Sequence, residues 1–229
     1  MNLAVAIGVD LGGTNVKVGL VDQTGRVIDS RSCPTQGEKG PQHFVNTVAT
    51  LVNVLIVQEK LDRSAIIGAG VGSPGPLDLK SGTLLRTANL PWVNVSIREL
   101  LSARLTLPVV LENDANAAAY GEFWCGRHGG CRNMVLLTLG TGVGAGVILD
   151  GHVLHGHFDN AGELGHMIVA PNGLPCPCGQ RGCLEAYSSA SGIVNRFKGA
   201  LEKGETTSLS GEITSKNISE AALAGDALS

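Results

Sequence analysis

The segment DLGGTNVKVGLVD, residues 10–22, aligns without gaps with TLGTGVGAGVILD, residues 138–150. Each copy has an apolar run, a glycine-containing turn and a second β-branched run, a pattern that predicts strand, loop and strand. A strand–loop–strand element that occurs twice can hold the phosphates of a nucleotide from two sides, with backbone N–H groups as the donors. The repeat therefore predicts a fold organised around two glycine loops.

Strands and helices alternate around these two copies. Three antiparallel strands are expected at 3–10, 15–21 and 26–30, because a turn at 22–25 joins the second to the third. Further strands are predicted at 66–72, 108–111, 134–139 and 143–149, and helices at 43–60, 96–105, 115–124, 186–201 and 218–228. The pattern predicts an α/β fold with a mostly parallel core sheet and an antiparallel flank.

A glycine-rich polar stretch at 125–130 interrupts this alternation. We place a domain boundary there. Residues 1–126 are expected to form an N-terminal α/β domain that carries the first glycine loop. Residues 127–229 are expected to form a partial C-terminal α/β domain that carries the second loop and a cysteine-rich segment.

The composition narrows the possible partners. The chain has 229 residues, 43% of them apolar, and a formal net charge of −3. No Lys/Arg cluster offers the basic face that nucleic acid requires, and no apolar run approaches the ~18 residues of a membrane span. The N-terminus lacks the basic start and cleavage site of a signal peptide. We expect a cytoplasmic protein with reduced thiols, small-molecule ligands, and neither nucleic acid nor membrane as a partner.

The segment GELGHMIVAPNGLPCPCGQRGCLE, residues 162–185, concentrates metal-ligating side chains. His166, Cys176, Cys178 and Cys183 supply one imidazole and three thiolates, the set that closes a tetrahedral structural zinc site. Two alternatives are buried apolar cysteines and a disulfide framework. The single residue between Cys176 and Cys178 leaves little room for an unstrained disulfide. The spacing favours structural Zn²⁺.

In the first glycine loop, Gly12 and Gly13 permit a turn that a Cβ would obstruct, and Thr14 and Asn15 add donors for phosphate oxygens. Asp10, at the strand end, could orient Mg²⁺ through water. The alternative is an ordinary glycine hairpin.

The second loop alternates glycine with small or β-branched residues, from Gly140 through Gly142. Neither copy matches G-x-G-x-x-G or G-x-x-x-x-G-K-[ST], so neither a Rossmann nor a Walker loop is supported.

The segment 112–116, ENDAN, lies where a predicted parallel strand becomes a helix, the edge of the sheet at which open α/β folds bind ligands. Asp114 there could act as a general base toward a sugar hydroxyl beside an incoming phosphoryl group. The alternative is that Asn113 or Asp114 only caps the helix.

Three further residues carry hydrogen-bonding groups suited to polyol hydroxyls: Glu163, His166 and Glu185. One ring nitrogen of His166 could contact the ligand while the other binds the metal. The remaining histidines at 43, 152, 155 and 157 have no partner at motif spacing, and we expect them in turns or on the surface.

Five motifs together resemble the ROK sugar kinases of the actin-like ATPase superfamily, most closely their bacterial glucokinases. They are DLGGTNVKVGLVD (10–22), GVGSPGPLD (70–78), ENDANAAAYGE (112–122), LGTGVGAGVI (139–148), and AGELGHMIV with CPCGQRGCLEAYSS (161–189). The resemblance covers residues 4 to 200. It implies two actin-like ATPase, or ribonuclease H-like, domains with a cleft between them, and assembly as a homodimer or higher homo-oligomer.

The resemblance also implies ATP-dependent phosphorylation of a hexose, above all glucose to glucose 6-phosphate, with Mg²⁺ and with Asp114 as the base. Sugar hydroxyls would be held by Ser73, Asn89, Asn113, Asp114, Glu163, His166 and Glu185. Phosphate contacts would come from Gly12, Gly13, Thr14, Thr141 and Gly142, to which the loop pattern adds Asn15 and Gly140, while Asp10 would bind the nucleotide through Mg²⁺. Zinc would bind His166, Cys176, Cys178 and Cys183.

Two alternatives to a glucokinase follow from the same comparison. One is a kinase for N-acetylmannosamine or another amino sugar, which shares the ELGH and cysteine motifs. The other is a sugar-binding protein without kinase activity, because the chain is truncated at its C-terminus relative to the family and its second domain is expected to be incomplete, with apolar surface exposed. The family's repressors carry a helix-turn-helix before the first strand, and we do not expect that branch here.

Overall fold

The computed structural model describes residues 4–87, 89–126 and 130–229. The chain forms two compact units: Met1–Leu136 with Gly146–Ala161, and Leu137–Ala145 with Gly162–Ser229. The predicted boundary falls in the stretch 125–130, of which residues 127–129 lie outside the described residues. That boundary, and the predicted cleft, stay predictions.

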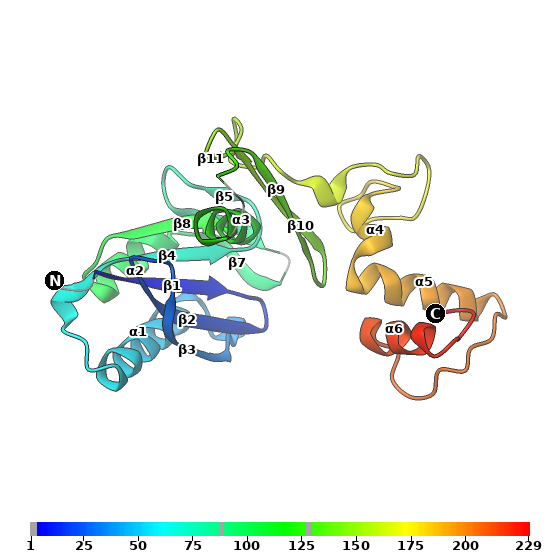
Figure 1. The fold of residues 1–229 in the computed structure, drawn as a ribbon, viewed down its shortest axis with the longest axis horizontal. Coiled ribbons are helices and arrows are strands. Elements are labelled where there is room, and N and C mark those ends of the chain that lie inside the picture. The colour runs from blue at the N-terminus through cyan, green and yellow to red at the C-terminus, as the bar shows by residue number, and fades with distance from the viewer. Residues whose placement is uncertain (1–3, 88, 127–129) are drawn as a thin grey trace. The chain divides into compact units, whose positions relative to one another are not determined.

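A five-stranded mixed sheet forms the centre of the first unit (Figure 1). Its strands are β1 (Val5–Leu11), β2 (Asn15–Asp22), β3 (Val27–Pro34), β4 (Ile66–Ser73) and β8 (Val109–Asn113), in the order β3-β2-β1-β4-β8. The first three strands are antiparallel, as predicted, and β1, β4 and β8 are parallel. The α/β class is confirmed, although parallel and antiparallel pairs are equal in number rather than mostly parallel.

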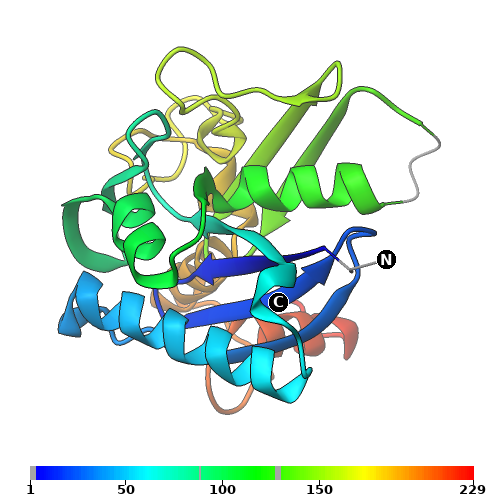
Figure 2. The same ribbon diagram turned by 90° about the vertical axis from the view of Figure 1, so that its left-hand side faces the viewer.

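Helices cover both faces of this sheet (Figures 1 and 2). On one face, α1 (Pro41–Gln58) and α2 (Ile97–Leu105) bury apolar side chains against the strands in a single core. On the other face lies α3 (Asp114–Cys125), near Gly72 of β4; a Cβ on Gly72 would lie 3.7 Å from the Cβ of Ala117. Because side chains alternate along a strand, Val71 packs into the core while Gly72 lets α3 approach closely.

A second sheet contains the repeated copy. It consists of β9 (Met134–Leu139), β10 (Val143–Leu149) and the short β11 (His152–Val153). A two-residue hairpin turn joins β10 to β11, with positive φ at Asp150 (49°) and Gly151 (83°). Positive φ at both central residues is the requirement of a type I′ turn. Both copies of the repeat thus form strand, loop and strand, as predicted.

A third sheet was not predicted. It is formed by β5 (Leu77–Asp78), β6 (Thr83–Thr87) and β7 (Leu90–Val95). Its side chains Leu84 and Trp92 join the main core, and the Trp92 indole N–H donates to the carbonyl of Gly37 in the 3₁₀ turn η1 (Gly37–Lys39) at 2.8 Å. The sheet is stabilised by these distant contacts, which leave little trace in local sequence. A second 3₁₀ turn, η2 (Arg63–Ala65), precedes β4.

The C-terminal part of the chain is helical. One helix is predicted over 186–201, but the structure has two, α4 (Leu184–Ser188) and α5 (Ala190–Glu202). Ser189 separates them: its backbone is extended (φ −75°, ψ 159°) and its side chain accepts the Gly192 N–H, so a new helix begins. The last helix, α6 (Ser215–Leu223), begins earlier than predicted, because Thr214 caps it.

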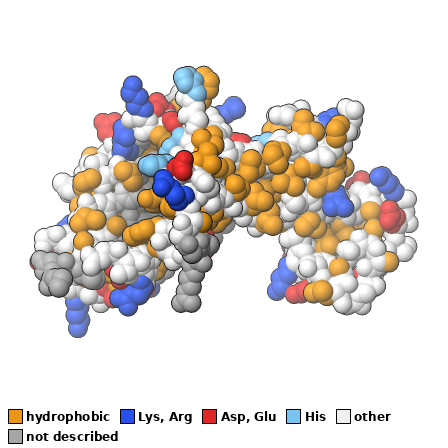
Figure 3. All heavy atoms as spheres, turned by 45° about the horizontal axis from the view of Figure 1, so that its top comes forward, with side chains coloured by type: hydrophobic (Ala, Val, Ile, Leu, Met, Phe, Trp, Pro, Cys, Tyr) orange, Lys and Arg blue, Asp and Glu red, His pale blue; other side chains and the backbone are white. Residues whose placement is uncertain are grey.

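Hydrophobic side chains reach the surface in many places (Figure 3). Among them are Val135, Leu137 and Leu139 on β9, which lies at an edge of its sheet. Among the residues that the structure describes, none of the helices combines the length and the apolar character that a membrane span requires.

Candidate functional site

The first glycine loop, between β1 and β2, is a tight turn. The Gly12 N–H donates to the Asn15 carbonyl at 3.0 Å, and a Cβ on Gly12 would lie only 2.6 Å from that oxygen. A Cβ on Gly13 would lie 2.5 Å from the Cβ of Asn89. Glycine is therefore required at both positions by close approach. The contact places Asn89, a predicted sugar residue, beside the predicted phosphate loop.

A residue outside the motif holds this loop. The Thr35 hydroxyl donates to the Gly12 carbonyl at 2.7 Å, and the Thr35 N–H donates to the Thr14 carbonyl at 2.9 Å. Thr35 is only 1% exposed. No local sequence pattern indicates this role, because Thr35 is 23 residues from Gly12 and belongs to no motif.

Asp114 is the first residue of α3. Asn113 is the N-cap, since its side-chain oxygen accepts the N–H groups of Ala115 and Asn116, both at 3.0 Å. Asp114 also accepts the Ala115 N–H, at 2.8 Å. The sequence left open whether Asn113 or Asp114 caps α3, and in the structure the N-cap is Asn113. One carboxylate oxygen of Asp114 therefore takes no part in capping.

The carboxyl group of Asp114 reaches the surface but is partly shielded from water by surrounding atoms. This desolvation raises the pKa of Asp114, and the nearby negative charge of Asp10 acts in the same direction, against the lowering effect of the Ala115 N–H. The neighbouring carboxylates of Asp10 in β1 and Asp114 in α3 suit a Mg²⁺ ion. In addition, a raised pKa makes the Asp114 carboxylate a stronger base.

Ser73 and Asn113 are adjacent at the ends of the parallel strands β4 and β8. Ser73 is fully buried and donates to the Pro74 carbonyl at 3.2 Å. This predicted sugar residue is therefore not displayed at the surface, whereas Asn89 is exposed.

Sequence reasoning missed His155. Its Nε2 lies 2.8 Å from a carboxylate oxygen of Glu112, the last but one residue of β8. The other Glu112 oxygen accepts the Asn113 N–H at 2.9 Å and the Asn116 amide at 3.1 Å. Glu112, which His155 contacts, thereby bonds the Asn113 backbone before Asp114 and the Asn116 side chain after it. The partners are 43 residues apart, so no motif spacing reveals them.

The second glycine loop, in the second unit, is held by the segment 185–191. Glu185 accepts the Val143 N–H at 2.9 Å, the Ala190 N–H donates to the Gly140 carbonyl at 2.8 Å, and the Ser191 hydroxyl donates to the Thr141 carbonyl at 2.6 Å. A Cβ on Gly142 would lie 2.5 Å from the Glu185 carboxylate. The glycine therefore makes room for the carboxylate.

The short 3₁₀ turn η3 (Leu164–His166) packs on the same loop. A Cβ on Gly165 would collide with the Val143 carbonyl, so only glycine permits this approach. Glu163 and His166 flank Gly165 in sequence. Close backbone packing thus brings these two predicted sugar residues to the loop that Glu185 holds.

The four predicted metal ligands come together. The ligand atoms of His166, Cys176, Cys178 and Cys183 all lie within 4.8 Å of one another. The Cys178 and Cys183 sulfurs are 3.7 Å apart, and the His166 Nδ1 is 3.7 Å from the Cys176 sulfur. A tetrahedral ion with metal–sulfur bonds of about 2.3 Å requires sulfur–sulfur distances of roughly 3.8 Å. The donor set and its spacing therefore fit a structural metal ion, and because Nδ1 faces the cluster, Nε2 is the nitrogen left for another partner.

All six cysteines have free thiols, so the disulfide alternative fails for this segment. Cys176 and Cys183 are buried, and burial raises the pKa of the Cys176 thiol to about 12. The pKa of Cys183 is raised for the same reason, whereas the Gln180 N–H lowers the pKa of Cys178. Buried thiols become thiolates only when a cation compensates the charge, as a metal ion does.

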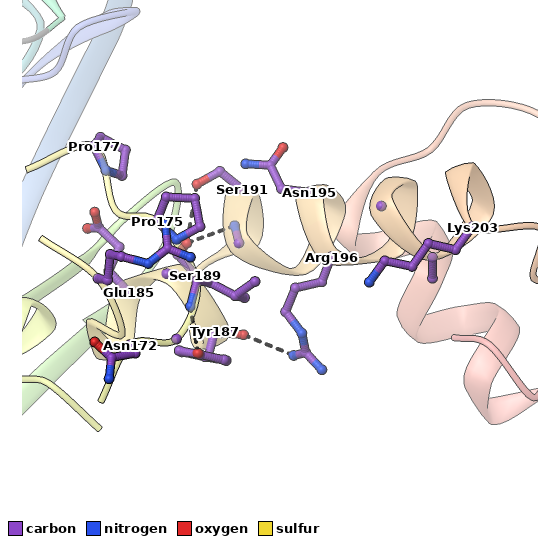
Figure 4. Close-up of a pocket in the computed structure, with 17 residues that line it drawn as sticks. Asn172, Pro175, Pro177, Glu185, Tyr187, Ser189, Ser191, Asn195, Arg196 and Lys203 are labelled. Carbon is purple, nitrogen blue, oxygen red and sulfur yellow. Dashed lines mark hydrogen bonds between the residues drawn. The ribbon is translucent and has the colours of Figure 1, made fainter. Parts of the chain in front are cut away.

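A cavity of about 700 Å³ lies within the second unit, between the cysteine-rich segment and α5 (Figure 4). Glu185 and Ser191 line it together with the cationic side chains of Arg181, Arg196 and Lys203. The Arg196 guanidinium donates to the Tyr187 carbonyl at 3.3 Å, as the figure shows. Two residues that hold the second loop therefore also border an accessible, positively charged space.

Comparison with known proteins matches this arrangement to one family. The ROK family profile matches residues 6–228. A glucokinase of Halalkalibacterium halodurans is 36% identical over 228 residues, which cover 96% of this chain and 69% of the relative. A xylose repressor of Caldicellulosiruptor bescii is 32% identical over 86% of this chain and 50% of the relative. A ROK family glucokinase from Streptomyces griseus, crystallised with glucose and AMPPNP, has a TM-score of 0.79 at 35% identity, over 98% of this chain and 73% of that one. The chain belongs to the ROK family.

Proposed function

We propose that this protein is a sugar kinase that transfers the γ-phosphoryl group of ATP to a hexose hydroxyl, with the 6-hydroxyl of glucose as the preferred acceptor. The observation that carries the proposal is the position of Asp114: a partly shielded carboxylate near Asp10, at the start of a helix that Asn113 already caps. Similarity to glucokinases, one of which binds glucose and AMPPNP, supports the choice of substrates.

In the proposed reaction, Asp114 accepts the proton of the attacking hydroxyl, and Asp10 would help to hold a Mg²⁺ ion, which would offset the charge of the phosphates. The backbone N–H groups of Gly13 and Thr14 in the first loop, and of Thr141 and Gly142 in the second, would stabilise the transferring phosphoryl group. Such donors are effective because their orientation is fixed before the reaction begins.

Sugar hydroxyls are proposed to bond with Asn89, Asn113, Glu163, His166 and Glu185. Ser73 is proposed as a sugar residue on the family resemblance alone, since its side chain is buried and donates to the Pro74 carbonyl. His166 would use Nε2, because Nδ1 faces the cysteine cluster.

The metal proposed for His166, Cys176, Cys178 and Cys183 is Zn²⁺, in a closed site. When bound, it supplies positive charge for the thiolates and fixes the segment that carries His166 and Glu185. The support for zinc over other ions is the Cys₃His donor set.

A coupled assay of ADP release tests the proposal, with glucose, fructose, N-acetylglucosamine and N-acetylmannosamine as acceptors. Glucose-dependent ADP release with glucose 6-phosphate as the product is the expected result. A higher kcat/KM for N-acetylmannosamine than for glucose would show that N-acetylmannosamine, and not glucose, is the preferred substrate. If no sugar stimulates ADP release, while calorimetry detects a sugar but no nucleotide, the protein is a sugar-binding protein and the kinase proposal is wrong.

A further inference from the structure

Both glycine loops are held from outside by a hydroxyl group that donates to a loop carbonyl. In the first loop the donor is Thr35, which bonds to the Gly12 carbonyl at 2.7 Å. In the second it is Ser191, which bonds to the Thr141 carbonyl at 2.6 Å. We propose that Thr35 and Ser191 are positioning residues that fix the peptide planes of the two loops so that their N–H groups face the nucleotide phosphates. The inference rests on the proposed function for the identity of the anion.

The geometry of the peptide unit gives the reason. In a trans peptide, the carbonyl of one residue and the N–H of the next point in opposite directions. When Thr35 holds the Gly12 carbonyl, the Gly13 N–H is turned to the other side. In the same way, the bond from Ser191 to the Thr141 carbonyl turns the Gly142 N–H away from Ser191. Successive N–H groups with one orientation form an anion-binding concavity.

Backbone donors complete each of these arrangements. The Thr35 N–H donates to the Thr14 carbonyl at 2.9 Å, and the Ala190 N–H donates to the Gly140 carbonyl at 2.8 Å. The second bond orients the Thr141 N–H as well. In each loop, therefore, two carbonyl oxygens are engaged on the side of the holding segment. A rotated peptide would instead present a partly negative oxygen to a phosphate, which is unfavourable, and glycine offers little steric resistance to such a rotation.

The repeat itself does not produce this similarity. Gly12 aligns with Gly140 and Gly13 with Thr141, but the holding residues lie outside both copies. Thr35 follows β3, and Ser191 lies in the first turn of α5. Two unrelated segments thus each supply a hydroxyl that donates to a loop carbonyl. This is expected if the orientation of the loop peptides, rather than local folding, requires that bond.

Ser191 offers the cleaner test because it is exposed, so that Ser191→Ala leaves no buried cavity. The matched control is Ser188→Ala, which removes a hydroxyl that donates only to the Leu184 carbonyl, at 3.0 Å. Affinities for AMPPNP with Mg²⁺ and for glucose are measured separately by calorimetry. We expect Ser191→Ala to weaken AMPPNP binding by roughly 3- to 10-fold, the effect of losing the hydrogen bond to the Thr141 carbonyl, with glucose affinity unchanged. Ser191→Thr, which keeps the hydroxyl, should retain the wild-type affinity for AMPPNP.

Thr35→Val provides the same test in the first loop, with Thr35→Ser as the variant that retains the hydroxyl. Thr35 is buried, so the melting temperature is measured beside each affinity. Weaker AMPPNP binding by Thr35→Val at temperatures well below its melting transition, together with recovery in Thr35→Ser, is the expected result. Equal losses of AMPPNP and glucose affinity in both hydroxyl-deleted variants would overturn the inference, because a positioning role is specific to the anion.

Hydrogen–deuterium exchange separates a failure of this inference from a failure of the proposed function. Loss of the Ser191 bond should increase exchange at the backbone of residues 140–143 by several-fold, whether or not the protein binds AMPPNP. Unchanged exchange in Ser191→Ala relative to Ser188→Ala would refute the holding role even in an active kinase. If exchange increases in Ser191→Ala but the protein does not bind AMPPNP, Ser191 does hold the loop and the proposal that the loop binds a nucleotide is wrong.

Discussion

One carboxylate oxygen of Glu185 accepts a hydrogen bond from the Val143 N–H at 2.9 Å. The other oxygen of Glu185 lies 3.9 Å from the sulfur of Cys176. A single side chain thus connects the second glycine loop with the cysteine cluster. Because Glu185 is also a proposed sugar ligand, the occupancy of the sugar site and the integrity of the cluster should both affect the loop.

Gly142→Ala should break the contact between Glu185 and Val143. The new Cβ would lie 2.5 Å from the Glu185 carboxylate, which must then move away. We expect kcat/KM to fall by about 10-fold, as for the loss of one charge-assisted hydrogen bond. Steady-state kinetics with ATP and with glucose measure the loss. Gly199→Ala in α5 is the control, since nothing lies within 4 Å of its added Cβ; an equal loss in the control would contradict this explanation.

Asp114→Asn should reduce kcat by about two to four orders of magnitude, because the amide cannot accept the proton. Glucose affinity should change little, since Asn retains an acceptor for the Ala115 N–H. In the wild type, the rate should rise with pH through the pKa of Asp114, which lies above the ordinary carboxyl value of 3.8. A large loss of glucose affinity in Asp114→Asn would show that Asp114 binds the sugar rather than acting as the base.

The same substitution should stabilise the folded protein near neutral pH. A carboxyl group whose pKa is raised by folding binds its proton more tightly in the folded state, so its ionisation makes stability fall as pH rises. Asp114→Asn removes this effect. The melting temperature of the variant should exceed that of the wild type at pH 7, and the difference should vanish below about pH 4. If the difference in melting temperature between the variant and the wild type stays the same from about pH 4 to pH 7, folding does not raise the pKa of Asp114.

Removal of the metal should affect both the cluster and the loop. Elemental analysis should detect one zinc per chain, and chelation should expose the thiols of Cys176, Cys178 and Cys183 to a thiol reagent. Chelation should also lower the melting temperature and weaken glucose binding, because His166 and Glu185 lose their support. Cys183→Ser should reproduce these changes, whereas Cys131→Ser, at an exposed cysteine outside the cluster, should not. If the chelated protein keeps its full affinity for glucose, the metal does not support the sugar site and the prediction is wrong.

The pair His155–Glu112 should contribute to stability as a unit. We expect a coupling free energy of about 0.5–1.5 kcal/mol in a double-mutant cycle of His155→Ala and Glu112→Gln, measured by denaturant unfolding. Turnover should fall as well, since Glu112 also holds the Asn113 N–H and the Asn116 amide beside Asp114. His43→Ala, at a half-buried histidine whose Nε2 lies 3.1 Å from the Gln36 amide oxygen, is the control. Additive effects of the two substitutions would show that the contact does not stabilise the protein.

Local sequence determined the elements and the composition of the candidate site. Alternating apolar residues predicted the strands of both repeats, and the spacing of His166, Cys176, Cys178 and Cys183 predicted a cluster that the structure brings together. Such signals are local, since strand periodicity and ligand spacing depend on neighbours a few residues away. The third sheet and the division of the helix at Ser189 were not predicted, because distant packing and one side-chain cap decide them.

Only the tertiary structure decided how the site is held. Thr35, Ser191 and the pair His155–Glu112 act across separations of 23, 50 and 43 residues, through single hydrogen bonds that no periodicity records. The glycines show the same division. The sequence indicated that Gly12 and Gly13 permit a turn and placed Gly142 in the second loop, but the groups that approach these glycines are the Asn15 carbonyl, the Asn89 side chain and the Glu185 carboxylate. A residue type specifies which contacts are sterically possible, and the fold determines which atoms make them.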